Sequence, residues 1–142
     1  MEQRDLIKDQ IEQLGRVLGH LLTGFRKLRD AGKPEQAIEV SNEQFHELLD
    51  KDVSGFVDMD YEEVKALVKK KQFNDEHLEL LSSYLEELAH TVASNDSNRA
   101  FEYVEQAIQL LELADEISAS ASFTRISKMN YLVSLKQQLH KG

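Results

Sequence analysis

Apolar residues recur in alternating steps of four and three along the N-terminal part of the chain. The series is Ile7, Ile11, Leu14, Leu18, Leu21, Phe25 and Leu28. This spacing is the heptad seam of a helix, which we predict over about residues 3 to 31. The helix is expected to end at Gly32, because glycine is favoured just beyond a helix. Pro34 suits a first helical turn and opens a second predicted helix that ends near Leu49.

These two helices differ in length. At about 1.5 Å per residue, the second covers only about 24 Å of a first helix that is about 42 Å long. Gly15 and Gly19 would let a neighbour approach the uncovered half closely. Either a later helix of the same chain or a second copy of the chain supplies the cover, and the sequence leaves both open. The seam residues predicted to form this interface are Ile7, Ile11, Leu14 and Leu18.

Further helices are predicted over about 60–71, 74–93, 98–117 and 124–140. The helix over 74–93 carries the stripe Leu78, Leu81, Leu85, Leu88 and Val92. The last helix is predicted to turn inward Ile126, Met129, Val133 and Leu139, and to cover the open end of the first. Residues 118–122 form a serine-alanine run that is either a break or a weak stretch of helix. The pattern predicts one all-α domain over residues 1–142, with about five to six helices and a long N-terminal one.

The segment Arg99–Leu111 reads R-A-F-E-Y-V-E-Q-A-I-Q-L-L. Ala100, Val104 and Ala107 fall on one helical face, with small residues at both ends that permit close packing. This arrangement resembles the second helix of a tetratricopeptide repeat, which packs against the first helix of its own hairpin. A similar pattern begins at Ala37, but the residues that follow in its helix do not continue it. The sequence therefore predicts one well-formed and one degenerate tetratricopeptide-like hairpin.

Three segments of the chain carry a wider resemblance. They read Q-R-D-L-I-K-D-Q-I-E-Q-L over 3–14, A-I-E-V-S-N-E-Q-F-H-E-L-L over 37–49, and A-I-Q-L-L-E-L-A-D-E-I-S over 107–118. Together they resemble a family of small bacterial helical proteins, a domain of unknown function with a tetratricopeptide-like region. The resemblance implies an all-helical fold and a bacterial cytosolic setting. It implies no catalytic or ligand-binding residues.

Composition and charge exclude several kinds of chemistry and partner. The 142 residues include one proline, six glycines and no cysteine, which favours helices and excludes thiol catalysis and thiolate metal sites. The net charge of −9 argues against nucleic acid or anionic lipid as the main partner, because both require basic surfaces. No apolar run approaches the roughly 20 residues of a membrane span. We therefore expect a cytoplasmic protein.

The segment Asp50–Tyr61 resembles the calcium loop of an EF-hand, with glycine at its sixth position. The candidate oxygen ligands are Asp50, Asp52, Ser54 and Asp58. Position twelve, where an EF-hand has a bidentate glutamate, is Tyr61. An acidic connector between two helices explains the same residues, and we predict no metal ligands here.

Two pairs of the form E-x-x-H, Glu43/His46 and Glu87/His90, have the spacing found in di-iron helical bundles. Their helical positions lie away from the apolar stripes, so all four side chains are predicted to face solvent. The glycines form no phosphate-binding loop, and the serines and histidines form no nucleophile motif. No cofactor is expected.

The sequence therefore favours a non-enzymatic module of the cytosol that binds a protein or peptide, or forms a homodimer through its first helix. Two alternatives stay open. One is a divalent-metal-binding helical protein that uses the connector Asp50–Tyr61, and the other is a small all-helical enzyme that uses clustered carboxylates.

Overall fold

The computed structural model describes residues 2–120 and 122–141, which form seven helices and contain no strand. The helices are α1 (Glu2–Asp30), α2 (Pro34–Leu49), α3 (Val53–Val57), α4 (Tyr61–Lys71), α5 (Asp75–Val92), α6 (Ser97–Ile117) and α7 (Phe123–Lys141). The all-α prediction is confirmed. The predicted number of about five to six helices was wrong, because α3 has only five residues and is too short to show a periodic pattern.

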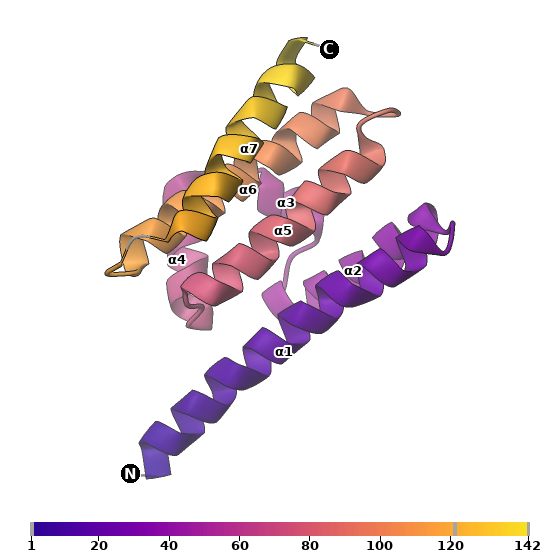
Figure 1. Ribbon diagram of the computed structural model, residues 1–142. Coiled ribbons are helices and arrows are strands. Elements are labelled where there is room, and N and C mark those ends of the chain that lie inside the picture. The colour runs from indigo at the N-terminus through magenta and orange to yellow at the C-terminus, as the bar shows by residue number, and fades with distance from the viewer. Residues whose placement is uncertain (1, 121, 142) are drawn as a thin grey trace.

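The helices form two packed pairs with a last helix on the outside (Figure 1). α2 lies along the C-terminal half of α1, and α6 lies along α5. α5 also contacts α1 and so joins the two pairs, while the N-terminal part of α1 extends past the other helices. α7 packs against α6 on the side of the molecule away from α1. The expectation that the last helix covers the open end of α1 was therefore wrong.

Four aromatic rings from four helices meet in the core. Phe45 of α2 contacts Phe56 of α3 at 5.3 Å and Tyr84 of α5 at 6.0 Å between ring centroids. Phe25 of α1 packs edge-on against the same tyrosine at 5.8 Å. The Tyr84 hydroxyl lies 2.7 Å from the Ser41 hydroxyl, so the buried phenol keeps a hydrogen-bond partner. Burial raises the pKa of Tyr84 far above its usual value.

The helix ends agree with the sequence prediction. Gly32 has φ +81°, and the N–H of the next residue, Lys33, donates to the carbonyl of Leu28, which closes α1. Asp60 and Asn74 accept from backbone N–H groups three residues on, and they cap α4 and α5. Within the described residues, no helix has the length and apolar content needed to cross a membrane.

The serine-alanine run is a break. α6 ends at Ile117, and the described residues 118–120 and 122 are not helical. The face predicted for α7 was partly wrong, because Ile126 and Val133 are 47% and 41% exposed. Leu132 points inward instead, while Met129 and Leu139 do pack against the core, as predicted. α7 carries apolar residues on two faces, so the spacing alone does not indicate which face is buried.

Candidate interaction surfaces

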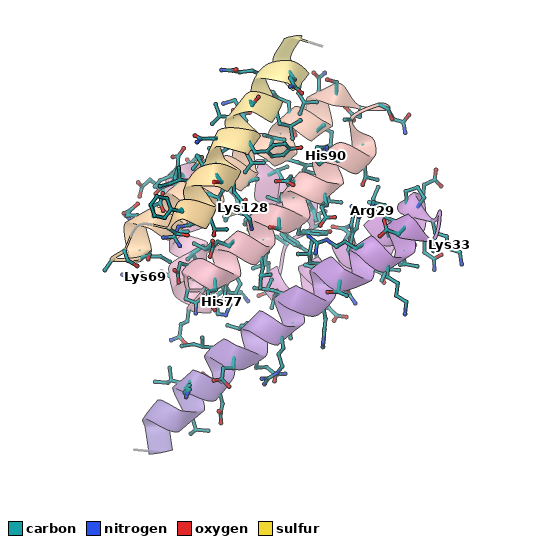
Figure 2. The ribbon with its side chains drawn as sticks, viewed as in Figure 1. Arg29, Lys33, Lys69, His77, His90 and Lys128 are labelled. Carbon is teal, nitrogen blue, oxygen red and sulfur yellow. The ribbon has the colours of Figure 1, made fainter. Side chains whose placement is uncertain are left out.

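The first turn of α5 covers the middle of α1. His77 donates from Nε2 to the carbonyl of Ile11 at 2.9 Å, while its Nδ1 accepts from the Asn74 N–H. A Cβ added at Gly15 would lie 3.7 Å from the His77 ring, an ordinary contact distance, so the approach of the imidazole does not require glycine here. Figure 2 shows His77 at the N-terminal end of α5. A later helix of the same chain therefore supplies part of the cover that the sequence left open.

Only part of the predicted interface is exposed in the structure. Leu18 is only 2% exposed and belongs to the core, so its place in an interface was wrong. Ile11 and Leu14 are half-buried, and Ile7 is 51% exposed. Leu6, which lies beside the seam in the half of the helix expected to need a partner, is 61% exposed. We call the part of α1 from Leu6 to Leu14 the free end of α1.

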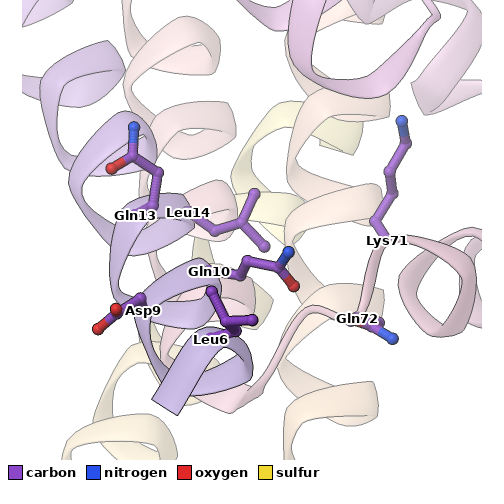
Figure 3. Close-up of a pocket in the computed structure, with 7 residues that line it drawn as sticks. All are labelled: Leu6, Asp9, Gln10, Gln13, Leu14, Lys71 and Gln72. Carbon is purple, nitrogen blue, oxygen red and sulfur yellow. The ribbon is translucent and has the colours of Figure 1, made fainter. Parts of the chain in front are cut away.

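A groove runs beside the free end of α1 (Figure 3). Its volume is about 500 Å³, and its walls are Leu6, Asp9, Gln10, Gln13 and Leu14 of α1, with Lys71 and Gln72 at the end of α4. Gln72 takes a left-handed conformation, φ 59°, that ends α4 at this point. Lys71 is held by an ion pair with Asp50 at 2.9 Å. Leucine side chains and a rim of amides and charges give the groove the composition of a small protein interface.

The connector between α2 and α4 does not have the form of an EF-hand loop. Asp50 turns toward Lys71, whose hydrogen bond lowers the pKa of that carboxyl. Asp52 caps α3 by accepting from the Gly55 N–H at 2.8 Å, Ser54 lies inside α3, and Asp58 follows its last turn. In the part of the chain that the structure describes, no group of three or more histidines or carboxylates is placed to hold a metal ion.

The connector is held in place by a residue that the sequence analysis missed. Gln106 of α6 is fully buried, and its Nε2 donates to the carbonyls of Phe56 and Met59 at 2.7 and 3.2 Å. Its Oε1 accepts from Gln109 at 2.7 Å. The Phe56 carbonyl also accepts from the Met59 N–H at 3.2 Å, so the amide adds a second bond there and ties the end of α3 to α6. The sequence does contain a sign of this role, since Gln106 is a polar residue next to Ala107, which lies on a helical face predicted to be packed.

We expect the Asp52→Ala variant to lose about 1 kcal/mol of stability, the usual cost of removing a helix cap. The loss should be the same with and without millimolar calcium, because Asp52 binds a backbone N–H in the folded chain. Thermal unfolding of the wild type and the variant, each with calcium and with chelator, measures both effects. A melting temperature that rises with calcium only in the wild type would instead identify Asp52 as a ligand.

The two E-x-x-H pairs have different surroundings. Glu43, His46 and His90 are exposed, as predicted. The prediction for Glu87 was wrong, because it is 8% exposed and accepts from both Arg26 and Arg29 of α1. α5 packs against α1 as well as α6, so a position beside its leucine stripe is also covered. Glu87 therefore holds α1 against α5.

A polar cluster joins α4 to α6 at the surface. Tyr61 donates to Glu116 at 2.5 Å, and Lys65 also bonds to that carboxylate. Burial, together with this carboxylate, raises the pKa of Tyr61 to about 12, while Lys65 and Tyr61 lower the pKa of Glu116. Both shifts move the pKa values of these groups further from pH 7. General acid-base catalysis needs a pKa near the working pH. The cluster suits helix packing better than chemistry.

The described surface thus offers an apolar groove with a polar rim, while Asp50 and Glu87 form ion pairs and Asp52 caps a helix. The groove is formed by two segments far apart in the sequence, at the end of α4 and along the free end of α1. Comparisons of the chain with protein-family models, with curated proteins and with solved structures find no match.

Proposed function

We propose that this chain is a non-enzymatic protein-interaction module that binds an amphipathic helix of a partner protein along the free end of α1. The observation that carries the proposal is the exposure of Leu6 and Ile7, at 61% and 51%, beside the groove that ends at Lys71. A cluster of exposed apolar side chains with a polar rim is typical of an interaction site, whereas single exposed apolar residues are common on any surface. The partner supplies the apolar cover that this chain lacks.

The continuity of the seam supports a helix as the occupant. Leu18, Leu21 and Phe25 belong to the same heptad series as Ile7 and Ile11, and they are buried in the core that α1 shares with α2 and α5. The free end presents the same spacing with no helix laid over its first turns (Figure 1). A helix with apolar residues three and four apart would continue this packing.

The scaffold behind this surface is, in our proposal, a tetratricopeptide-like arrangement of a bacterial cytosolic protein. Ala100, Val104 and Ala107 are fully buried, which supports the small-large-small pattern. The Ser82 hydroxyl donates to the carbonyl of Ala107 at 2.9 Å, a contact that requires α5 and α6 to approach closely. Such a scaffold presents α1 as a rigid docking element.

A photoreactive side chain at Asp9, which lines the groove, tests the proposal in cells of the native host. We expect one discrete adduct with a second protein, and none when the same side chain replaces Glu43, an exposed residue of α2. Adding Ile7→Glu should reduce the adduct at least about tenfold, because burying an apolar anchor is worth more than about 1.4 kcal/mol.

The Ile7→Glu variant should keep its melting temperature within about 3 °C, because substitutions at exposed positions change stability by less than about 0.5 kcal/mol. Equal adducts at positions 9 and 43, or an adduct that survives Ile7→Glu, would contradict the proposed surface. An adduct made only of two copies of the chain would overturn the proposed partner.

A further inference from the structure

Among the side chains that the structure describes on α7, none of those classed as exposed is charged. The exposed apolar residues are Phe123, Ile126, Tyr131 and Val133, and all other exposed side chains described on α7 are serine, threonine, asparagine or glutamine. Charged residues make up 30% of the chain, so their absence over several helical turns is not explained by composition. We call the side that these exposed residues form the outer face of α7.

Three charged side chains described on α7 bond to the neighbouring helices instead. Arg125 is 3% exposed and reaches Asp115 at 2.7 Å and Asp75 at 3.2 Å. Lys128, which Figure 2 shows between α7 and α5, donates to Ser83 at 3.1 Å, and Lys136 lies 3.5 Å from Glu105. A surface helix normally turns its charges to solvent and its apolar side inward. In α7 the charges described lie on the packed side, and the exposed side carries apolar and uncharged polar side chains.

Large apolar side chains are left in water by this arrangement. Phe123 is 89% exposed, and Ile126 and Val133 are each more than 40% exposed. Ile117, at the end of α6, adds a further exposed apolar side chain at 44%. Interface cores are depleted in charged residues and enriched in aromatic ones, and the outer face of α7 has both properties.

We propose that two copies of this chain pair through the outer faces of their α7 helices across a two-fold axis. A two-fold contact places the same patch against itself, so a charge near the axis would meet its own like charge. Two copies that each carry a net charge of −9 can approach most easily where the surface has no charge. A partner of opposite charge would be recognised through charged groups, which this face lacks.

The polar residues of the face also suit a second copy. Asn130 and Gln137 each carry amide donors and an acceptor, so either can bond to the same residue type across the axis. α7 lies away from α1 (Figure 1), so this pairing leaves the free end of α1 open and is independent of the function proposed above. A stable dimer buries about 800 Å² per partner. The proposed contact is made mainly by one helix of each copy, so we expect a micromolar dissociation constant.

Sedimentation equilibrium at tens of micromolar chain tests the pairing. We expect the wild type to have twice the 16.3 kDa mass of the chain. Ile126→Glu places two like charges near the axis and should raise the dissociation constant at least about a hundredfold. Ile7→Glu is the matched control, because it introduces the same charge at an equally exposed isoleucine on α1, and it should leave the dimer intact.

A cysteine cross-link provides a second measurement. The chain has no cysteine, and Asn130 lies near the middle of the outer face. Oxidised Asn130→Cys should form a disulfide-linked dimer, whereas Glu43→Cys, exposed on α2, should not. A monomeric wild type at 100 µM with no more cross-linking at position 130 than at 43 would overturn the proposal. A dimer dissociated by Ile7→Glu and not by Ile126→Glu would overturn it too.

Discussion

Replacing Gln106 with glutamate is expected to destabilise the protein by about 3 kcal/mol at pH 7, the largest loss that we expect from one substitution. The wild-type amide is fully buried and donates to the carbonyls of Phe56 and Met59. An ionised carboxylate can only accept hydrogen bonds, so it would face two carbonyl oxygens and could donate to neither. The Phe56 carbonyl would keep the bond from the Met59 N–H, whereas the Met59 carbonyl would lose its bond from the amide. Each buried polar group without a partner costs about 1–3 kcal/mol.

The Gln106→Glu variant should also respond to pH. Burial among carbonyl oxygens raises the pKa of the new carboxyl above its value of about 4.3 in the unfolded chain. The folded state then binds more protons than the unfolded state, so stability falls as the pH rises above about 4.3 and levels off above the folded pKa. At low pH the protonated carboxyl can donate to one of the carbonyls, and part of the loss should be recovered.

Urea unfolding of the wild type, Gln106→Glu and Gln106→Leu at pH 5 and pH 8 separates the two causes. The leucine variant loses the same two hydrogen bonds but adds no titrating group. Its difference from the wild type should therefore be the same at both pH values. If the glutamate variant also differs from the wild type by a constant amount, its carboxyl is not buried among the carbonyls.

The second large effect is expected at Arg125. We expect Arg125→Met to cost about 2–3 kcal/mol, because it leaves the carboxylates of Asp75, Glu79 and Asp115 close together without their shared cation. The carboxylates are partly exposed, so the cost lies below that of a fully buried ion pair. Arg125 also donates to the carbonyl of Ser120, so the turn that enters α7 loses a hydrogen bond as well.

Lys136→Met is the control for this prediction. Lys136 also joins α7 to α6, through Glu105, but its side chain is 39% exposed, so its removal should cost less than about 0.5 kcal/mol. Hydrogen exchange should show that α7 opens first in Arg125→Met. Equal stability of the Arg125→Met and Lys136→Met variants would mean that the buried ion pairs do not hold α7.

Local signals were enough to predict the boundaries of the six longer helices, but not the short α3. Gly32 with Pro34, Asp60 and Asn74 act through their own backbone or through groups three residues away, so each boundary can be read in a short window of sequence. The heptad seam of α1 likewise needs no knowledge of its neighbours. The seam alone does not show whether α5 or a second copy covers it. The answer comes from the contact of His77 with Ile11, which joins positions 66 residues apart and is not visible in a short window of sequence.

The errors share one physical cause, which is packing on more than one side. Glu87 was assigned to solvent because its position was measured from a single apolar stripe, whereas α5 is covered by α1 and α6. Ile126 was assigned to the core because α7 has apolar residues on both faces, and the carboxylates of α5 and α6 draw in Arg125 instead. Gln106 was missed because its role depends on carbonyls that lie in another helix.

The aromatic cluster also determines how the chain unfolds. In an array of structural repeats each unit contacts only its neighbours, so units can be added, removed or melted one at a time. Here Phe25 and Phe45 come from the first helix pair, Phe56 from the connector and Tyr84 from the second pair, and their rings pack against one another. Neither pair keeps a complete core alone, so we expect the two pairs to unfold together instead of one after the other.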